Sequence, residues 1–431
     1  MRLFSLSTLR SLWRDRRGNA LMITAFALPV IVGGAGLGVH SIQLTVAKRQ
    51  LQREADSAAL AGAHSLYQDQ TDSSAVAASN QALAQNPLVT GATPTVQVTG
   101  SYTSSGTTYA KTMFVRLTHD EPTSFMSLFG INSATVVAEA RAATAPIGDF
   151  CFLALEDGNN TGIIFGGNAT IDLDCGVATN STHGTMAIRA NGNPTVIATP
   201  LIAQGMIENS TAFSNSTQME DHDELTNPFD GMSLNPSSST VSNGQCKNGQ
   251  NWKTITDANW TTATPGCYGK IDINGTVTLP DGTYYIADHS NQGGLVLGAS
   301  ANLTCNACTF VLTSTTNNQA ATMSINGNAE LHLGPPTSGT YDGITIYRDS
   351  RAAASNQCCT INGNANSDLS GAYYFPNDEL TFNGNAGMTL ECFQLVALRL
   401  QFTGNPEIDN SCPDRPGNED DWTINAVRLI G

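Results

Sequence analysis

Acidic side chains are the first residues in this sequence whose types and spacing could support chemistry. Asp172 and Asp174 alternate with apolar residues, so a strand would place both carboxylates on one face. Acid/base catalysis needs such carboxylates to be clustered on rigid strands. A denser acidic run covers residues 220–224, where it could bind Ca²⁺, and another covers residues 418–421. We interpret all three as solvated surface and assign no catalytic residue.

Cysteines are the second candidate group, and all ten lie between Cys151 and Cys412. Cys305 and Cys308 form a C-x-x-C, but no second ordered pair or histidine follows at the spacing of a zinc site, so we expect no metal and no cofactor. Disulfides persist in oxidising compartments, so the distribution predicts disulfides in an exported region, with buried free thiols as the alternative. Spacing alone does not fix connectivity, but the candidate pairs are Cys151 with Cys175, Cys246 with Cys267 and Cys392 with Cys412.

Charge and motifs exclude several classes of function. The formal net charge is -16, and residues 51–431 hold 13 basic and 35 acidic residues. A body this acidic would repel phosphates, so nucleic acid is not an expected partner. The sequence contains no Walker A motif, no dinucleotide fingerprint, and no histidine paired with a Ser or Cys in a nucleophile motif.

A short motif recurs between residues 165 and 406: an apolar residue lies two positions before a glycine, and an asparagine usually follows that glycine. The last copies are 21 and 20 residues apart. Such a repeat, with Gly/Asn corners and no helical periodicity, predicts a solenoid in which the asparagine amides stack along the axis. Residues 150–431 are thus predicted to form a right-handed parallel β-helix-like body, with a β-sandwich of hairpins as the alternative. The repeat positions are Gly167, Asn168, Gly192, Asn193, Gly275, Gly327, Asn328, Gly363, Asn364, Gly384, Asn385, Gly404 and Asn405.

The element that must position this body is an apolar segment near the N-terminus. Residues 18–47 contain no Asp, Glu, Lys or Arg, and Ala20–Val39 is long enough to span a bilayer as a helix. Arginines at positions 10, 14, 16 and 17 precede it, which predicts a cytoplasmic leader over residues 1–17 and a body outside the cytoplasm. We predict an uncleaved single-pass anchor in a bacterial inner membrane; the alternatives are a buried core helix and a cleaved signal. The anchor side chains are Ala20, Leu21, Ile23, Phe26, Leu28, Val30, Ile31, Val32, Leu37 and Val39.

The helix is predicted to continue beyond the membrane as a stalk. A narrow stripe rich in alanine follows helical spacing, so a partner could approach it closely. Packing against the chain's own domain and self-association between copies are equally favoured. The stripe residues are Leu44, Ala47, Leu51, Ala55, Ala58 and Ala59.

Three features together carry a family resemblance: Arg16-Arg17-Gly18-Asn19, the apolar span with Gly36-Leu37-Gly38-Val39, and Leu51-Gln52-x-x-Ala55-Asp56-x-Ala58-Ala59-Leu60-Ala61-Gly62-Ala63. In this order and spacing they resemble the Tad/Flp pilus-assembly family, specifically its TadG-like N-terminal domain, here residues 18–66. The resemblance implies an envelope protein needed for tight-adherence pili. It also implies other pilus-assembly proteins or pilins as partners.

Residues 67–145 are predicted to form a small α+β module between stalk and body. Thr95–Val98, Met113–Leu117 and Ala134–Ala143 have strand character, and Phe125–Phe129 is a short helical or turn segment closed by Gly130. We therefore expect a non-catalytic, membrane-anchored protein with a structural or adhesive role and a periplasmic or surface-exposed body. Two other functions stay open: a pilus-independent carbohydrate-binding adhesin, which an exposed aromatic groove would favour, and a glycan-processing β-helix enzyme, which three or more converging carboxylates would favour.

Overall fold

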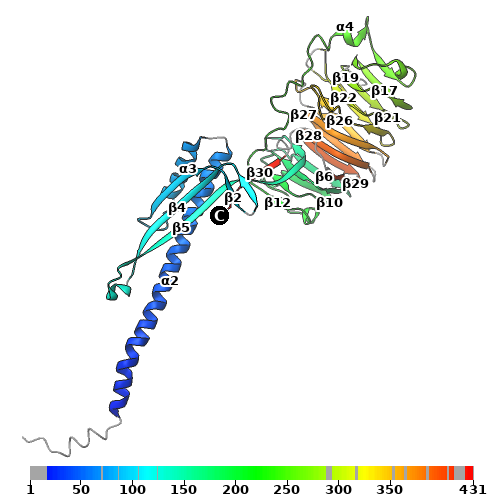
Figure 1. Cartoon of the computed structure of the whole chain (residues 1–431). Helices are drawn as coiled ribbons and strands as arrows, with labels where there is room; N and C mark the ends of the chain where they lie inside the picture. The colour runs from blue at the N-terminus through cyan, green and yellow to red at the C-terminus, as the bar shows by residue number, and fades with distance from the viewer. Residues whose placement is uncertain are drawn as a thin grey trace, which may run out of the picture. The chain divides into compact units, whose positions relative to one another are not determined.

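The chain forms two compact units (Figure 1). The first comprises Met1–Ala145 and Asn425–Gly431, and the second comprises Pro146–Ile424. The computed structural model describes residues 17–68, 71–85, 87–104, 106–123, 125–287, 294–315, 319–351, 355–363, 366–384, 388–404, 407–411 and 423–430. Nearly all of the predicted leader lies outside these residues.

Two helices and an antiparallel sheet build the first unit. The sheet pairs β1 with β4 and β4 with β5, and a small hairpin joins β2 to β3. Side chains alternate across the strands, so Met113 and Val115 of β4 face the helices together with Ala140 and Ala142 of β5. The elements are α2 (Arg17–Tyr67), α3 (Asp72–Gln85), β1 (Thr93–Thr99), β2 (Tyr102–Ser104), β3 (Thr107–Tyr109), β4 (Thr112–Pro122), η1 (Met126–Phe129) and β5 (Ser133–Ala154).

The last strand belongs to this unit, so our expectation that the body extends to residue 431 was wrong. β30 (Thr423–Leu429) pairs with β5. The Ile430 N–H donates to the carbonyl of Arg141 at 2.8 Å, and the Ser104 hydroxyl donates to the carbonyl of Ile430 at 2.6 Å. The second unit is therefore inserted between two strands of the first.

Three rows of parallel strands build the second unit, and most strands pair with the one three elements later along the chain. Examples are β17–β20–β23–β26, β18–β21–β24–β27 and β19–β22–β25. The first row holds β7 (Thr170–Leu173), β10 (Thr195–Ile197), β18 (Thr276–Thr278), β21 (Asn302–Cys305), β24 (Glu330–Leu333) and β29 (Glu407–Ser411). The second holds β8 (Gly176–Thr179), β11 (Leu201–Ala203), β12 (Gln218–Met219), β16 (Gly266–Tyr268), β19 (Gly282–Ile286), β22 (Cys308–Leu312) and β25 (Ile344–Arg348).

The third row holds β6 (Ile163–Gly167), β9 (Ile188–Gly192), β15 (Thr254–Thr256), β17 (Lys270–Ile273), β20 (Gly294–Leu297), β23 (Thr322–Ile325) and β26 (Ser355–Gly363). The long strands β27 (Asp368–Gly384) and β28 (Met388–Gly404) take part in all three rows. β28 also pairs with β5 and β6, and β29 pairs with β7, so the late strands stack on the earliest ones. Irregular chain with η2 (Thr211–Phe213), α4 (Asn243–Cys246), β13 (Lys247–Asn248), β14 (Asn251–Trp252) and η3 (Trp260–Thr262) leads to the other strands.

The repeat glycines fall in register where strands leave the third row. Gly363 pairs with Gly384, Gly384 with Gly404, and Gly167 with Gly192. Gly167 and Gly404 have φ of 67° and 83°, which glycine adopts without strain. The apolar residue two positions before each of three of these glycines faces the core: Phe402 stacks on Phe165 and Phe382 with ring centroids 5.1 and 6.0 Å apart.

The asparagines of the motif do not form the described part of this core. The side chains of Asn168, Asn193 and Asn328 are exposed. Backbone bonds join copies, since the N–H of Asn168 donates to the carbonyl of Gly404 at 3.1 Å. Asn364, Asn385 and Asn405 lie outside the described residues, so the amide stack stays a prediction.

Candidate membrane and partner interface

Helix α2 is continuous but has two halves with opposite surroundings. Within the described residues it is the one helix long and apolar enough to cross a membrane. Its apolar half is uncovered: Ile23, Phe26 and Val30 are 63%, 75% and 74% exposed. Eight of the ten predicted anchor side chains are exposed in this way, since Leu28, Ile31, Val32, Leu37 and Val39 are exposed as well. Nothing is described for the side chains of Ala20 and Leu21. Apolar surface of this extent is stable in lipid, not in water.

The other half of α2 is buried against the chain's own sheet. Leu51, Ala55, Ala58 and Ala59 are fully buried, and they pack with Met113, Val115 and Leu117 of β4 and Ala138, Ala140 and Ala142 of β5. Alanine keeps the helix close to the sheet because its side chain is short. The sequence left two roles open for the stripe, packing against the chain's own domain and self-association. In the structure the chain's own domain covers it.

Polar groups beside the stripe fix the register of helix on sheet. The Gln52 amide donates to the carbonyl of Glu139 at 2.7 Å and to the carboxylate of Asp56 at 2.8 Å. The Lys48 ammonium donates to the carbonyl of Val137 on the same strand. The buried carboxylate of Glu54 accepts the N–H groups of residues 88 and 89 and so ties the loop after α3 to α2.

Glycine at position 62 permits the closest approach of the two helices. A Cβ there would lie 2.7 Å from Cγ of Met113 and would also overlap the hydroxyl of Ser79. That hydroxyl donates to the carbonyl of Ala58 at 2.8 Å. The Gln-x-x-Ala-Asp-x-Ala-Ala-Leu-Ala-Gly-Ala motif is therefore a packing motif: its residues shape one face of α2 for α3 and the sheet.

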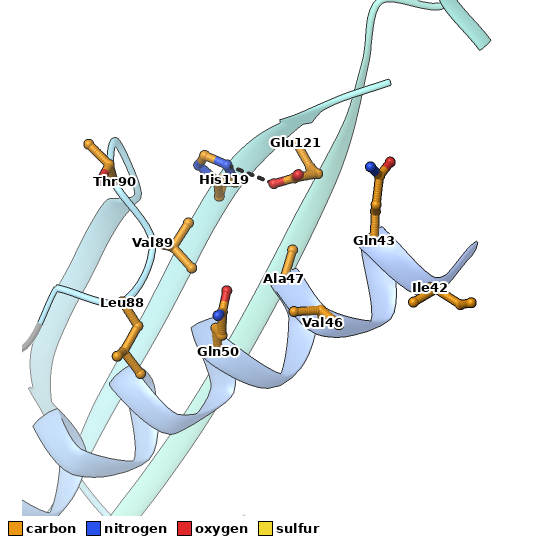
Figure 2. A pocket seen from close by; sticks show the side chains of 10 residues that line it. All are labelled: Ile42, Gln43, Val46, Ala47, Gln50, Leu88, Val89, Thr90, His119 and Glu121. Carbon is orange, nitrogen blue, oxygen red and sulfur yellow. Dashed lines mark ion pairs between the residues drawn. The ribbon is translucent and has the colours of Figure 1, made fainter. Parts of the chain in front are cut away.

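A groove of about 390 Å³ lies where α2 leaves the apolar span (Figure 2). Its walls come from α2, the loop after α3, and β4: Ile42, Gln43, Val46, Ala47, Gln50, Leu88, Val89, Thr90, His119 and Glu121. His119 Nε2 lies 3.2 Å from a carboxylate oxygen of Glu121, and its buried Nδ1 has no hydrogen-bond partner. Its lining combines apolar side chains with a few polar ones, which suits binding of a side chain or a short segment.

Those acidic candidates of the second unit that the structure describes do not assemble into a site. Asp172 and Asp174 are exposed on the outside of the first row. In the run 220–224, Glu220 accepts the N–H of Ile207 at 2.7 Å, and the remaining carboxylates do not converge with it. The run 418–421 lies outside the described residues. In the part of the chain that the structure describes, no three carboxylates bring their oxygens within 4.8 Å of one another.

Cysteines of the second unit are joined in pairs. Cys151 pairs with Cys175 and Cys246 with Cys267, with Cα atoms 5.8 and 4.6 Å apart. Cys392 is also disulfide-bonded, but Cys412 lies outside the described residues, so that pairing stays a prediction.

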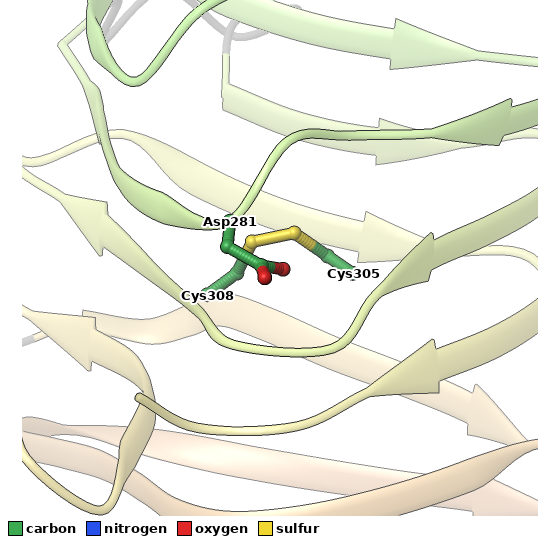
Figure 3. Close-up of side chains that lie close together, drawn as sticks. All are labelled: Asp281, Cys305 and Cys308. Atoms are coloured by element: carbon green, nitrogen blue, oxygen red, sulfur yellow. A yellow bond between two sulfur atoms is a disulfide. The ribbon is translucent and has the colours of Figure 1, made fainter. Parts of the chain in front are cut away.

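One cluster of metal-ligand types occurs among the described residues, formed by Asp281, Cys305 and Cys308 (Figure 3). The two sulfurs form a disulfide and offer no thiolate. Asp281 instead accepts the N–H of Ala307 at 3.2 Å, which stabilises the turn between β21 and β22. The cluster is therefore a turn cross-linked by a disulfide.

A second group of aromatic side chains in the second unit stacks in a smaller hydrophobic cluster. Tyr347 and Tyr374 have ring centroids 5.7 Å apart, and Phe229 of the irregular segment packs on Tyr374 at 4.6 Å. Every aromatic side chain described between residues 150 and 402 is buried or half-buried. Burial raises the pKa of Tyr374 to about 12, with smaller effects from its neighbours. The described surface therefore presents no aromatic groove for a sugar.

Comparison with known proteins identifies the N-terminal segment. Residues 18–65 match the family model described as "Tad: Putative Flp pilus-assembly TadE/G-like", which confirms the resemblance over that segment. No curated protein matches at the significance required. Among solved structures, the chain is similar to the Shewanella frigidimarina ice-binding protein_1 DUF3494 domain at 15% identity, over 64% of this chain and 98% of that one. The TM-score is 0.21, too low to support an argument.

Proposed function

Because residues 18–65 carry the TadE/G-like domain of the Flp pilus-assembly family, we propose that this chain is a membrane-anchored, non-catalytic component of a Tad/Flp-type pilus system. The observation that carries the proposal is the division of α2. The apolar residues of the motif at positions 51–63 pack α2 onto its own sheet, while the preceding residues stay exposed. A family domain built this way presents its apolar half to lipid and the turns just beyond it to partners.

The proposed topology is a single pass through the inner membrane, with the basic leader in the cytoplasm and both units outside. The arginines before the span favour this orientation, and disulfides in the second unit fit an oxidising compartment. A reporter enzyme inserted after residue 70, between α2 and α3, should be active only outside the cytoplasm. Activity of a cytoplasmic reporter at that position would reverse the orientation.

The partner surface is proposed to be the face of α2 at the groove. Ile42 and Val46 are 66% and 48% exposed just beyond the span. In the bacterium that makes the chain, a photo-crosslinking residue at position 42 should yield adducts with pilus-assembly proteins or pilins. The same residue at position 51, buried against the sheet, is the matched control and should not. Equal adducts from both positions would show that the exposed face is not the docking surface.

The second unit is proposed to be a right-handed parallel β-solenoid with a structural or adhesive role outside the membrane. Parallel pairing three elements apart supports this over a sandwich of hairpins, which pairs its strands in antiparallel fashion. Removal of Pro146–Ile424, replaced by a short Gly/Ser linker, tests the role. Normal anchoring with loss of tight adherence would support it, and unchanged adherence would contradict it.

A further inference from the structure

The loop between β4 and β5 lies against the part of α2 that is proposed to be in the membrane. A Cβ added at Gly36 would overlap the ring of Phe125, so the ring lies directly on the helix at that glycine. Gly33, Gly34 and Gly38 have nothing within 4 Å of such a position, so the contact is specific to one face. Gly36 lies three residues before Val39, hence about 4–5 Å inside the outer end of the apolar span.

The composition of this loop matches that depth. Residues 123–132 read TSFMSLFGIN and contain no charged side chain, whereas Asp120 and Glu121 lie just before them, separated by Pro122. Ile131 is 47% exposed, and Phe125 and Met126 are half-buried. An apolar loop beside a bare apolar helix has lipid as its natural surroundings.

The backbone of the loop is also prepared for a medium of low polarity. The N–H of Thr123 donates to the carbonyl of Asn132 at 3.0 Å, and its hydroxyl donates to the carbonyl of Ile131. The N–H of Ile131 donates to the carbonyl of Met126 at 3.1 Å, and Gly130, with φ of 83°, caps η1. Backbone groups bonded within the loop lower the cost of leaving water, which unsatisfied groups would make prohibitive.

We propose that the β4–β5 loop is a second membrane contact, which inserts residues 125–131 into the headgroup and upper acyl region of the same leaflet from which α2 emerges. The inference rests on the proposed membrane anchorage. Its consequence is that the first unit is held against the lipid surface at two points. The groove of Figure 2 then opens just above the lipid surface, with Ile42 about 4–5 Å beyond the span.

Lipid photolabelling of the full-length protein tests this contact. The protein is reconstituted in nanodiscs of phosphatidylcholine and phosphatidylglycerol that contain a phospholipid with a diazirine on its acyl chain. After irradiation and proteolysis, mass spectrometry should find adducts in residues 20–39 and 125–131. The β2–β3 hairpin, residues 102–109, is the internal control and should carry none.

The outcomes separate this inference from the proposed anchorage. Adducts in residues 20–39 without adducts in 125–131 would overturn the second contact and leave the anchor intact. Absence of adducts from both segments would overturn the anchorage and the inference together. Adducts in both segments, with none in 102–109, support both.

Variants of the loop and of the helix sharpen the test. Ile131→Lys combined with Met126→Lys should abolish labelling of the loop while leaving that of residues 20–39 unchanged, and Thr108→Lys in β3 is the matched control. Gly36→Leu should displace the Phe125 ring and reduce loop labelling, whereas Gly38→Leu, which meets open space, should not. Loop labelling that survives the double lysine change would contradict insertion.

Discussion

Truncation of Leu51 tests directly whether the family motif serves packing or partner binding. Leu51 is fully buried between α2 and the sheet, with an exposed fraction of 0%. Leu51→Ala removes three buried carbon atoms and leaves a cavity, which costs about 2–5 kcal/mol of folding free energy. Leu88→Ala is the matched control, because the same atoms are removed from a side chain that is 51% exposed in the same unit. The control should cost about 0.5 kcal/mol or less.

Hydrogen exchange on the full-length protein in detergent measures the effect unit by unit. A loss of about 2–5 kcal/mol raises the opening equilibrium, and so the exchange rate of the most protected amides, by about 30-fold to several thousand-fold. The increase should appear in peptides from β4 and β5 and be absent from peptides of the second unit. If Leu51→Ala exchanged like Leu88→Ala but lost its pilus partners, the motif would be a docking surface and our argument would fail.

Three further changes probe other contacts. Asp378→Asn leaves the buried guanidinium of Arg348 without its ion-pair partner and should destabilise the second unit by about 3–5 kcal/mol in thermal unfolding, whereas replacing both by apolar residues should cost much less. Burial opposes ionisation of Asp349, but hydrogen bonds from Arg351 and other donors hold its pKa below the usual value. Its stabilising contribution is therefore present above the ordinary carboxyl pKa and lost as pH falls through the lowered one; unfolding midpoints of Asp349→Asn and wild type should differ at pH 7 and converge in acid. Gly62→Val should destabilise the first unit by about 1–3 kcal/mol through overpacking, as measured by the same exchange experiment. If the variant exchanged at the rates of the wild type, the helices would be free to separate and the close packing inferred at Gly62 would be contradicted.

Several elements could be predicted from local sequence because local physics decides them. The segment from Ala20 to Val39 is too apolar for water, and the helix that follows lacks breakers until Gly62. Alternation predicted β1, β4 and β5, and Gly130 predicted the end of η1, since only glycine adopts its positive φ readily. The helix α3 was missed: its alanines carry little periodic signal, and its start depends on a weak cap in which Thr71 accepts the N–H of Ser74.

Other features were settled only when distant segments met. Periodicity showed an apolar stripe on α2, but a stripe does not say whether the chain or a second copy covers it; the sheet, some 60 to 90 residues away, does. The pairing of β30 with β5 could not be predicted from local sequence either, because an edge strand of seven residues has the same pattern in any sheet. The groove and the contact of Phe125 with Gly36 are likewise products of the antiparallel turn that brings the β4–β5 loop back along the helix. Composition and periodicity determine which side chains of a segment are apolar enough to be buried. Only the tertiary structure determines which other residues cover them.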